Sequence, residues 1–154
     1  MKYISALLMA LLFAGCTSKL TEEQKNQIAK EVETTVREHL NPKTFSLNTH
    51  LDLRADKEGY LFAGDGTIVA TDYKTFKDFC TKSLADFSRF INLDIIKIYT
   101  YVLAEDAATT TMEFKGRFIT TAGDTLPNNG CWTMVFIKYD GKWKVIQENG
   151  THTK

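Results

Sequence analysis

The side chains in this sequence that could act as acids, bases or metal ligands are few and lie far apart. His39, His50 and His152 share no short spacing of the kind that zinc ligands have, so we expect no metal site. A carboxylate or an imidazole can act as a general base when it lies within hydrogen-bond reach of a substrate. Asp52, Asp56 and His152 are therefore the candidate catalytic residues, although the segment from Asp52 to Asp56 also fits a solvated turn.

Two cysteines offer a second kind of chemistry. Neither Cys80 nor Cys131 has a histidine near it in the sequence, so a thiol nucleophile is a weak hypothesis. In an oxidising compartment the pair could form a disulfide, and the alternative is that each is a separately buried thiol. The sequence has no P-loop, no nucleophile elbow and no dinucleotide-binding glycine motif, and we expect no cofactor.

A turn signal near the end of the chain fixes the faces of two strands. Asp140-Gly141 between apolar runs predicts a tight hairpin, and strict alternation from that turn then assigns each side chain to a face. One face combines large aromatic side chains with two amides, which is typical of a small-molecule pocket; an ordinary core is the alternative. The candidate ligand-binding residues are Tyr60, Trp132, Met134, Gln147 and Asn149. The opposite face carries Val135, Ile137, Ile146 and Glu148 and could meet a second subunit.

These residues must be positioned by an α+β arrangement of helices followed by strands. Thr21 and Gln24 form a capping box, and apolar residues at every fourth position predict a helix over 21–40 that ends at Asn41-Pro42. Residues 43–58 are ambiguous and could include a short second helix. We expect further elements as follows: short strands at 59–63 and 67–70, a helix from 71 or 72 to about 90, and strands at 95–103, 109–121, 130–139 and 142–151.

Composition narrows the class of partner. The 154 residues include 19 lysine and arginine against 19 aspartate and glutamate residues, so nothing suggests a nucleic-acid partner. Ten Phe, six Tyr and two Trp suit a packed aromatic core or a core that contains an aromatic cavity.

The N-terminus has the pattern of a secretion signal. Lys2 precedes an apolar run over 4–14, which is too short to span a bilayer, and small residues follow. Ala14-Gly15-Cys16 resembles the lipobox of bacterial lipoproteins, which implies a signal peptide at 1–15, a lipidated Cys16, a tether at 16–20 and one domain at 21–154. Simple secretion with an incidental Cys16 is the alternative. The resemblance implies a lipid-anchored location in the cell envelope, at the outer membrane, and Asp124-Thr125-Leu126 resembles an O-glycosylation site of Bacteroidota.

The order of elements and the closing motif resemble the nuclear transport factor 2-like (NTF2-like) superfamily, nearest to its SnoaL-like and DUF4440-like branch. The motif runs from Trp132 to Phe136, through Asp140-Gly141-Lys142-Trp143, to Gly150-Thr151-His152. The resemblance implies a cystatin-like cone, in which a curved antiparallel sheet wraps around the N-terminal helices, and it implies a cavity and often a homodimer. The ketosteroid isomerase-like members use a tyrosine of the first helix, and residues 21–40 contain none.

Three functions follow from these expectations. The first is an envelope lipoprotein that binds a small apolar or amphipathic molecule without catalysis. The second is a small isomerase, cyclase or hydrolase with an aspartate or histidine base. The third is a dimerisation or interaction module that uses the face with Val135, Ile137 and Ile146.

Overall fold

A computed structural model describes residues 19–153 of this chain. The helices are α1 (Glu22–His39), α2 (Leu47–Asp52) and α3 (Tyr73–Ser83). The strands are β1 (Leu61–Gly64), β2 (Thr67–Ala70), β3 (Phe87–Ala104), β4 (Ala107–Thr120), β5 (Thr125–Pro127), β6 (Asn129–Tyr139) and β7 (Lys142–Thr153). The expected signal peptide and Cys16 lie outside the described residues.

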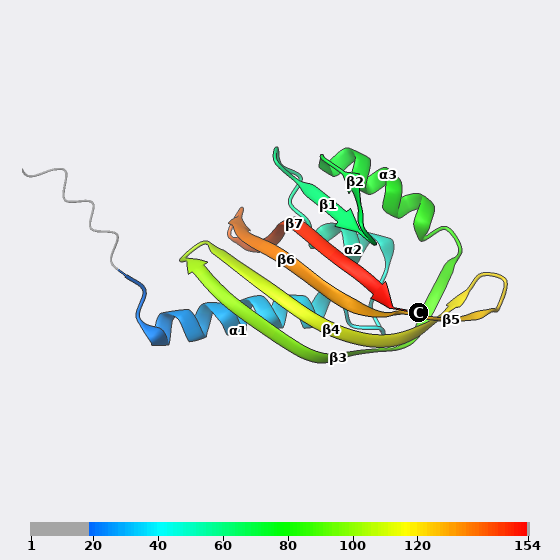
Figure 1. Cartoon of the computed structure of the whole chain (residues 1–154), viewed down its shortest axis with the longest axis horizontal. Coiled ribbons are helices and arrows are strands. Elements are labelled where there is room, and N and C mark those ends of the chain that lie inside the picture. The colour runs from blue at the N-terminus through cyan, green and yellow to red at the C-terminus, as the bar shows by residue number, and fades with distance from the viewer. Residues whose placement is uncertain (1–18, 154) are drawn as a thin grey trace, which may run out of the picture.

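A curved, unclosed sheet wraps around α1 (Figure 1). Its strands follow the order β2-β1-β7-β6-β4-β3, with β5 paired to β4. The pairing of β1 with β7 is parallel, whereas the other strand pairings are antiparallel. Helix α3 lies at the other side of the molecule from α1, next to β1 and β2. The expected α+β cone with a curved antiparallel sheet is confirmed.

Helix α1 begins and packs as its sequence predicts. The side chain of Thr21 accepts from the backbone N–H of Gln24, and the Gln24 side chain accepts from the N–H of Thr21. Ile28, Val32 and Val36 are buried from this helix against the concave face of the sheet. Burial of that stripe, rather than helix propensity, supplies most of the stability of such a helix.

The boundary between α3 and β3 differs from the expectation. The helix was expected to reach about Phe90, but it ends at Ser83, and β3 begins at Phe87. Irregularities in the β3–β4 register between Phe87 and Arg89, and between Phe90 and Asn92, each insert a residue. They place Phe87, Phe90 and Leu93 on one face at three-residue steps, which imitates a helical period.

The last hairpin has the expected turn but a different register beyond it. Asp140 and Gly141 both have positive φ angles, 50° and 74°, and Tyr139 pairs with Lys142. Phe136 pairs with Val145 and Val135 with Gln147, so Ile146 is the extra residue of a β-bulge.

The bulge reverses the predicted faces of the end of β7. Gln147 and Asn149 are exposed on the outer face, whereas Glu148 is buried on the inner face. The assignment of Gln147 and Asn149 to a pocket face is therefore wrong, because an inserted residue moves each later side chain of the strand to the opposite face.

The segment that follows α2 is joined to β7 next to this bulge. The N–H of Val145 donates to the carbonyl of Leu53 at 2.8 Å, and the N–H of Ala55 donates to the carbonyl of Val145 at 2.8 Å. These bonds bring Arg54 beside β7, where it forms an isolated parallel bridge to Val145.

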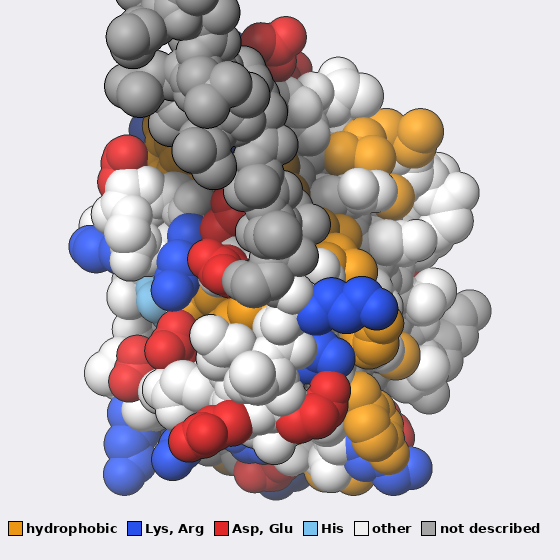
Figure 2. All heavy atoms as spheres, turned by 90° about the vertical axis from the view of Figure 1, so that its left-hand side faces the viewer, with side chains coloured by type: hydrophobic (Ala, Val, Ile, Leu, Met, Phe, Trp, Pro, Cys, Tyr) orange, Lys and Arg blue, Asp and Glu red, His pale blue; other side chains and the backbone are white. Residues whose placement is uncertain are grey.

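Two properties of the surface bear on partners: the hydropathy of its helices and the charges on one end of the molecule. Among residues 19–153, no helix combines the length and the apolar character needed to cross a bilayer. Acidic and basic side chains are interspersed on the end of the molecule from which α1 starts (Figure 2).

Gly150 makes a testable contact on the inner face. It pairs with Trp132, and a Cβ at this position would overlap the indole ring. We expect Gly150→Ala to lower the free energy of unfolding by about 1–3 kcal/mol, because the ring must leave its packed position. Urea denaturation measures this loss. Asn149→Ala, at the exposed neighbouring position, is the control and should change stability by less than about 0.5 kcal/mol. Equal stability of the two variants would contradict this packing.

Candidate functional site

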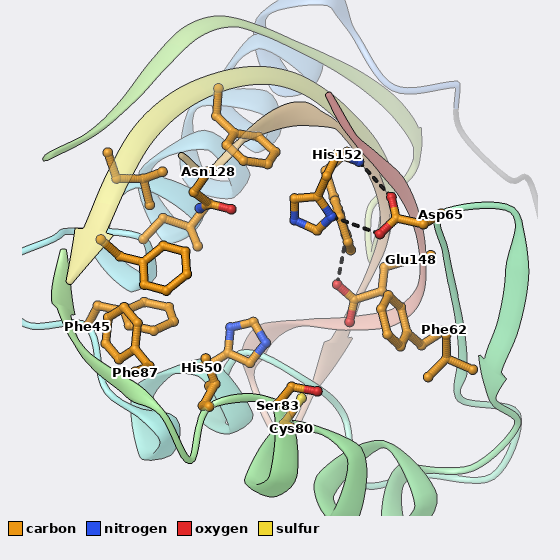
Figure 3. A pocket seen from close by; sticks show the side chains of 18 of the residues that line it. Phe45, His50, Phe62, Asp65, Cys80, Ser83, Phe87, Asn128, Glu148 and His152 are labelled. Atoms are coloured by element: carbon orange, nitrogen blue, oxygen red, sulfur yellow. Dashed lines mark hydrogen bonds and ion pairs between the residues drawn. The ribbon is translucent and has the colours of Figure 1, made fainter. Parts of the chain in front are cut away.

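A cavity of about 590 Å³ lies between α3 and the concave face of the sheet (Figure 3). Its walls are mainly apolar, and the aromatic side chains among them include Phe45, Phe62, Phe87, Phe114, Phe118 and Trp132. A few polar side chains reach the same space, chiefly His50, Arg54, Glu148 and His152. Mostly apolar walls with a small number of placed polar groups are the composition of ligand pockets.

Glu148 is the best-connected polar group of this cavity. Its side chain has no exposed area, and its oxygens accept four hydrogen bonds. Oε1 accepts from Nε of Arg54 at 2.9 Å and from the hydroxyl of Tyr60 at 2.5 Å. Oε2 accepts from Nη2 of Arg54 at 2.7 Å and from the indole Nε1 of Trp132 at 3.0 Å. These bonds occupy the acceptor positions that a carboxylate has.

The charges of this network follow from its contacts. Burial acts to raise the pKa of Glu148, but the Arg54 charge and the hydrogen bonds prevail and lower that pKa to about 2. Burial acts to lower the pKa of Arg54, and the Glu148 charge prevails and raises it. Burial, together with the Glu148 charge, raises the pKa of the Tyr60 hydroxyl. Glu148 is therefore an ionised anchor whose lone pairs are occupied, and it is not free to act as a base.

His50 is held as a neutral imidazole, and its contact with Arg54 assigns the tautomer. Its Nδ1 lies 3.1 Å from Nη1 of Arg54, and a guanidinium can only donate, so Nδ1 is the acceptor and Nε2 carries the proton. Burial and, after it, the Arg54 charge lower the pKa of His50 to about 3. The ring points into the cavity (Figure 3). Among residues 19–153, Nε2 of His50 has no hydrogen-bond partner.

His152 pairs with a carboxylate at the rim of the cavity. Its backbone N–H donates to Oδ1 of Asp65 at 2.7 Å, and its Nδ1 lies 3.0 Å from Oδ2 of Asp65. These hydrogen bonds lower the pKa of Asp65. The imidazole meets Trp132 and Phe114 edge-on, with ring centroids 5.4 and 6.3 Å apart. Asp65 is in the turn between β1 and β2, where its φ angle is 49°.

The structure places only some of the expected site residues in the cavity. Trp132, Met134 and His152 line it. Tyr60 lies behind Glu148 and reaches the site only through its hydrogen bond. The structure does not bring the other candidates into the cavity: Asp52, Asp56, Gln147 and Asn149.

Asp52 and Asp56 are not catalytic groups of this cavity. Asp52 is bound at the surface by Nζ of Lys144 at 3.0 Å and by Nε2 of His39 at 3.5 Å. Asp56 is exposed. Asp52 is the last residue of α2 and Asp56 lies in the segment after it, and neither lines the cavity.

Sequence reasoning missed four residues that carry the polar chemistry of the cavity: His50, Arg54, Asp65 and Glu148. Arg54 stands between the apolar Leu53 and Ala55, which is a weak signal, whereas Glu148 stands between the polar Gln147 and Asn149 and gave none; both are charged residues. Such residues are seldom buried unless they are paired. Their separation of 94 residues left the partner of each unidentified.

Cys80 and Cys131 are free thiols, so the disulfide that the sequence left open is not formed. Cys80 is buried on α3 and lines the cavity, where burial raises the pKa of its thiol to about 12. Cys131 is exposed on the outer face of β6. Cys80 therefore faces the cavity from a helix, whereas Cys131 lies on the opposite side of the sheet. Within the described part of the chain, no cluster of three His, Cys, Asp or Glu side chains is placed to hold a metal ion.

Solved structures with the same fold exist although sequence similarity is low. No family model and no curated protein matches this sequence. A Novosphingobium aromaticivorans protein provisionally identified as a scytalone dehydratase has a TM-score of 0.74 at 13% identity, over 87% of this chain and 89% of its own. A ketosteroid isomerase-like protein of Erwinia carotovora atroseptica has a TM-score of 0.67 at 13% identity, over 84% and 98% of the two chains. An NTF2-like protein of unknown function from Prochlorococcus has a TM-score of 0.62 at 20% identity, over 88% and 95%. The fold is therefore the NTF2-like cone.

Removal of the Glu148 charge tests the anchor. We expect Glu148→Gln to lower the free energy of unfolding by about 3–5 kcal/mol, because Arg54 keeps its charge in a buried place without a counter-ion. Urea denaturation gives the value, and Glu58→Gln at an exposed position is the control. A loss below about 1 kcal/mol would show that solvent reaches the pair.

The neutral state of His50 predicts a dependence of stability on pH. The folded pKa of about 3 lies below the ordinary value of 6.5, so the unfolded chain binds the proton more readily. The stability due to this difference is complete above about pH 6.5 and is lost as the pH falls toward 3. Chemical denaturation at a series of pH values should show a shallower decline over this range in His50→Gln than in the wild type. A His39→Gln variant, changed outside the cavity, serves for comparison. Parallel curves for wild type and His50→Gln would contradict the prediction.

Proposed function

We propose that this protein binds a small, largely apolar molecule that has one polar end. The observation that carries the proposal is the cavity of about 590 Å³, whose aromatic walls converge on a few polar atoms. The side chains that line such a cavity lack packing contacts on one side. A protein interior normally has few voids larger than a water molecule. A bound molecule with apolar surface would restore those contacts.

The polar atoms of the cavity indicate which chemical group the polar end of the ligand carries. The N–H of His50 is a donor without a partner in the described structure, whereas the oxygens of Glu148 are already occupied. A ligand acceptor such as a carbonyl or ether oxygen can therefore bond to His50. An anionic ligand group would also lie near Glu148, which is ionised, and repulsion favours a neutral ligand.

The expectation of binding without catalysis depended on two observations: an aromatic face that carries Gln147 and Asn149, and the absence of a tyrosine from the first helix. Gln147 and Asn149 lie outside the cavity, so only the second observation still supports it. The ionisable groups that line the cavity support catalysis as the second candidate function. The shared fold of a ketosteroid isomerase-like protein supports a small organic ligand in either case.

The place of action and the assembly are further parts of this proposal. The sequence around Cys16 supports a lipid anchor at the envelope of a bacterium, and α1 begins at Glu22, close to that anchor.

Tyr99 and Tyr101 on the outer face of β3 are 69% and 70% exposed, which supports a second copy of the chain on that face.

A pair of serine variants tests ligand binding. Ser83 lines the cavity at the end of α3, whereas Ser88 is exposed on β3 and does not line it. We expect saturation-transfer NMR to detect naphthalene and α-tetralone bound to the wild type. Ser83→Phe should weaken binding about tenfold or more because the ring occupies ligand space, a change worth about 1.4 kcal/mol. Ser88→Phe should bind as the wild type does.

Two outcomes would contradict the proposed function. One is the absence of binding of both probes to the wild type at millimolar concentration. The other is equal binding by the two serine variants, which would place the probes elsewhere on the surface.

A further inference from the structure

The rim of the cavity carries a negative charge that no cationic side chain neutralises. The charged side chains that line the cavity are Arg54, Asp65 and Glu148. Arg54 and Glu148 are joined at 2.7 Å, so their charges cancel. No lysine or arginine of the described residues pairs with Asp65, whose partner is the ring of His152 at 3.0 Å. With that ring neutral, the lining carries one net negative charge, which favours a ligand with a positive group.

The neutral ring of His152 presents a hydrogen-bond acceptor to the cavity. Nδ1 lies 3.0 Å from Oδ2 of Asp65, and a carboxylate can only accept, so Nδ1 carries the proton. Nε2 is then left with a lone pair, and Figure 3 shows the imidazole directed into the cavity. The backbone N–H of His152 donates to Oδ1 of Asp65 at 2.7 Å, so the carboxylate is held by both of its oxygens. The acceptor at Nε2 is thereby fixed in position.

Neighbouring side chains at the rim also suit a cation. The side chain of Asn128 points into the cavity (Figure 3), and its amide oxygen is an acceptor. The rings of Trp132 and Phe114 lie beside the imidazole of His152, with centroids 5.4 and 6.3 Å from it. A cation within about 6 Å of the face of an aromatic ring is attracted to that face. The rim thus combines acceptors, aromatic rings and a negative charge, which are the features that bind ammonium groups.

We propose that the ligand of this cavity is an arylalkylamine, whose ammonium group binds at the rim beside Asp65 and His152 and whose apolar body lies among the aromatic walls. This inference rests on the proposed function, because it uses the same cavity, and it adds a positive charge at the outer end of the ligand.

The two histidines that reach the cavity determine which end of such a ligand lies at the rim. An ammonium group has three N–H donors and no acceptor, so it can bond to Nε2 of His152. It cannot bond to Nε2 of His50, which carries a proton because Arg54 donates to Nδ1. An acceptor oxygen elsewhere on the ligand can bond to His50 instead. The amine end therefore faces the rim and the apolar body lies inside.

The position at the rim also limits the cost of binding a charge. The side chains of His152 and Asp65 are 47% and 59% exposed, so an ammonium group between them keeps part of its hydration. A fully buried ammonium group would lose that hydration at a high cost. The same exposure screens the attraction to Asp65, and we therefore expect effects of moderate size.

Three ligands of nearly equal size test the charge at the rim: β-naphthylmethylamine, β-naphthylmethanol and β-naphthoic acid. At about pH 8 the amine is protonated, the acid is ionised and an ordinary imidazole is neutral. Isothermal titration calorimetry with the wild type should give the lowest Kd for the amine, about fivefold or more below that of the alcohol, and the highest Kd for the acid. High salt should reduce the advantage of the amine and change the Kd of the alcohol little.

Asp65→Asn tests the rim more sharply, because it also reverses the polarity of the ring. The asparagine oxygen can still accept from the backbone N–H of His152, but its amide nitrogen donates to Nδ1, which leaves the proton on Nε2. The Kd of the amine should rise about tenfold, while the Kd of naphthalene stays unchanged and shows that the cavity is intact. Asp106→Asn, which removes an exposed carboxylate between β3 and β4, is the matched control and should bind each probe as the wild type does.

His152→Phe separates the acceptor from the charge. The phenyl ring can keep the contacts with Trp132 and Phe114, and the backbone N–H of residue 152 can still hold Asp65. Only the lone pair of Nε2 is lost. The Kd of the amine should rise about threefold, and the Kd of naphthalene should not change.

Each outcome bears on one of the two proposals. If neither naphthalene nor the amine binds to the wild type, the small-molecule site is wrong and this inference with it. If naphthalene binds but the amine binds no more tightly than the alcohol, only this inference is wrong. An unchanged Kd of the amine in Asp65→Asn would also overturn it. So would an equal rise in Asp65→Asn and Asp106→Asn, because the effect would then come from the overall charge of the protein.

Discussion

The buried ion pair of Arg54 and Glu148 is the constraint on which the site depends. Two ions taken out of water are costly, and the cost is offset only when geometry and hydrogen bonds are complete. Here the carboxylate receives two bonds from Arg54 and one each from Tyr60 and Trp132. These four residues come from the segment after α2, the residue just before β1, strand β6 and strand β7. One carboxylate thereby joins parts of the chain that form one wall of the cavity, and it also fixes the tautomer of His50 through Arg54.

Local rules were sufficient for much of the fold. The capping box at Thr21, the helix cap at Asp72 and the turn at Asp140-Gly141 depend on residues within a few positions, and all three are present in the structure. The failures occur where a strand departs from strict alternation. Bulges near the start of β3 gave Phe87 and Phe90 a helix-like spacing. The bulge at Ile146 exchanged the faces of Gln147 and Glu148.

The same limit explains what was missed in the site. His152 and Trp132 could be proposed from their residue types and strand positions. Glu148 could not, because a one-residue insertion decides whether it points to solvent or to the core. Asp65 belongs to a turn whose composition indicates only a loop, and its role depends on the parallel pairing of β1 with β7. Long-range pairing of this kind leaves no periodic signal in a single sequence.

The parallel pairing of β1 with β7 also bears on the order in which the protein can fold. The antiparallel strands β3, β4, β6 and β7 join neighbours that are close in sequence, and such contacts form early. Arg54 and Glu148 are 94 residues apart, and β1 has no place in the larger sheet until β7 has left the ribosome. The wall of the cavity can therefore be completed only after β7 has been synthesised. Until that point one edge of the β1–β2 hairpin has no partner strand, and aromatic side chains of the cavity wall are exposed. A chaperone would be a suitable transient partner for this surface.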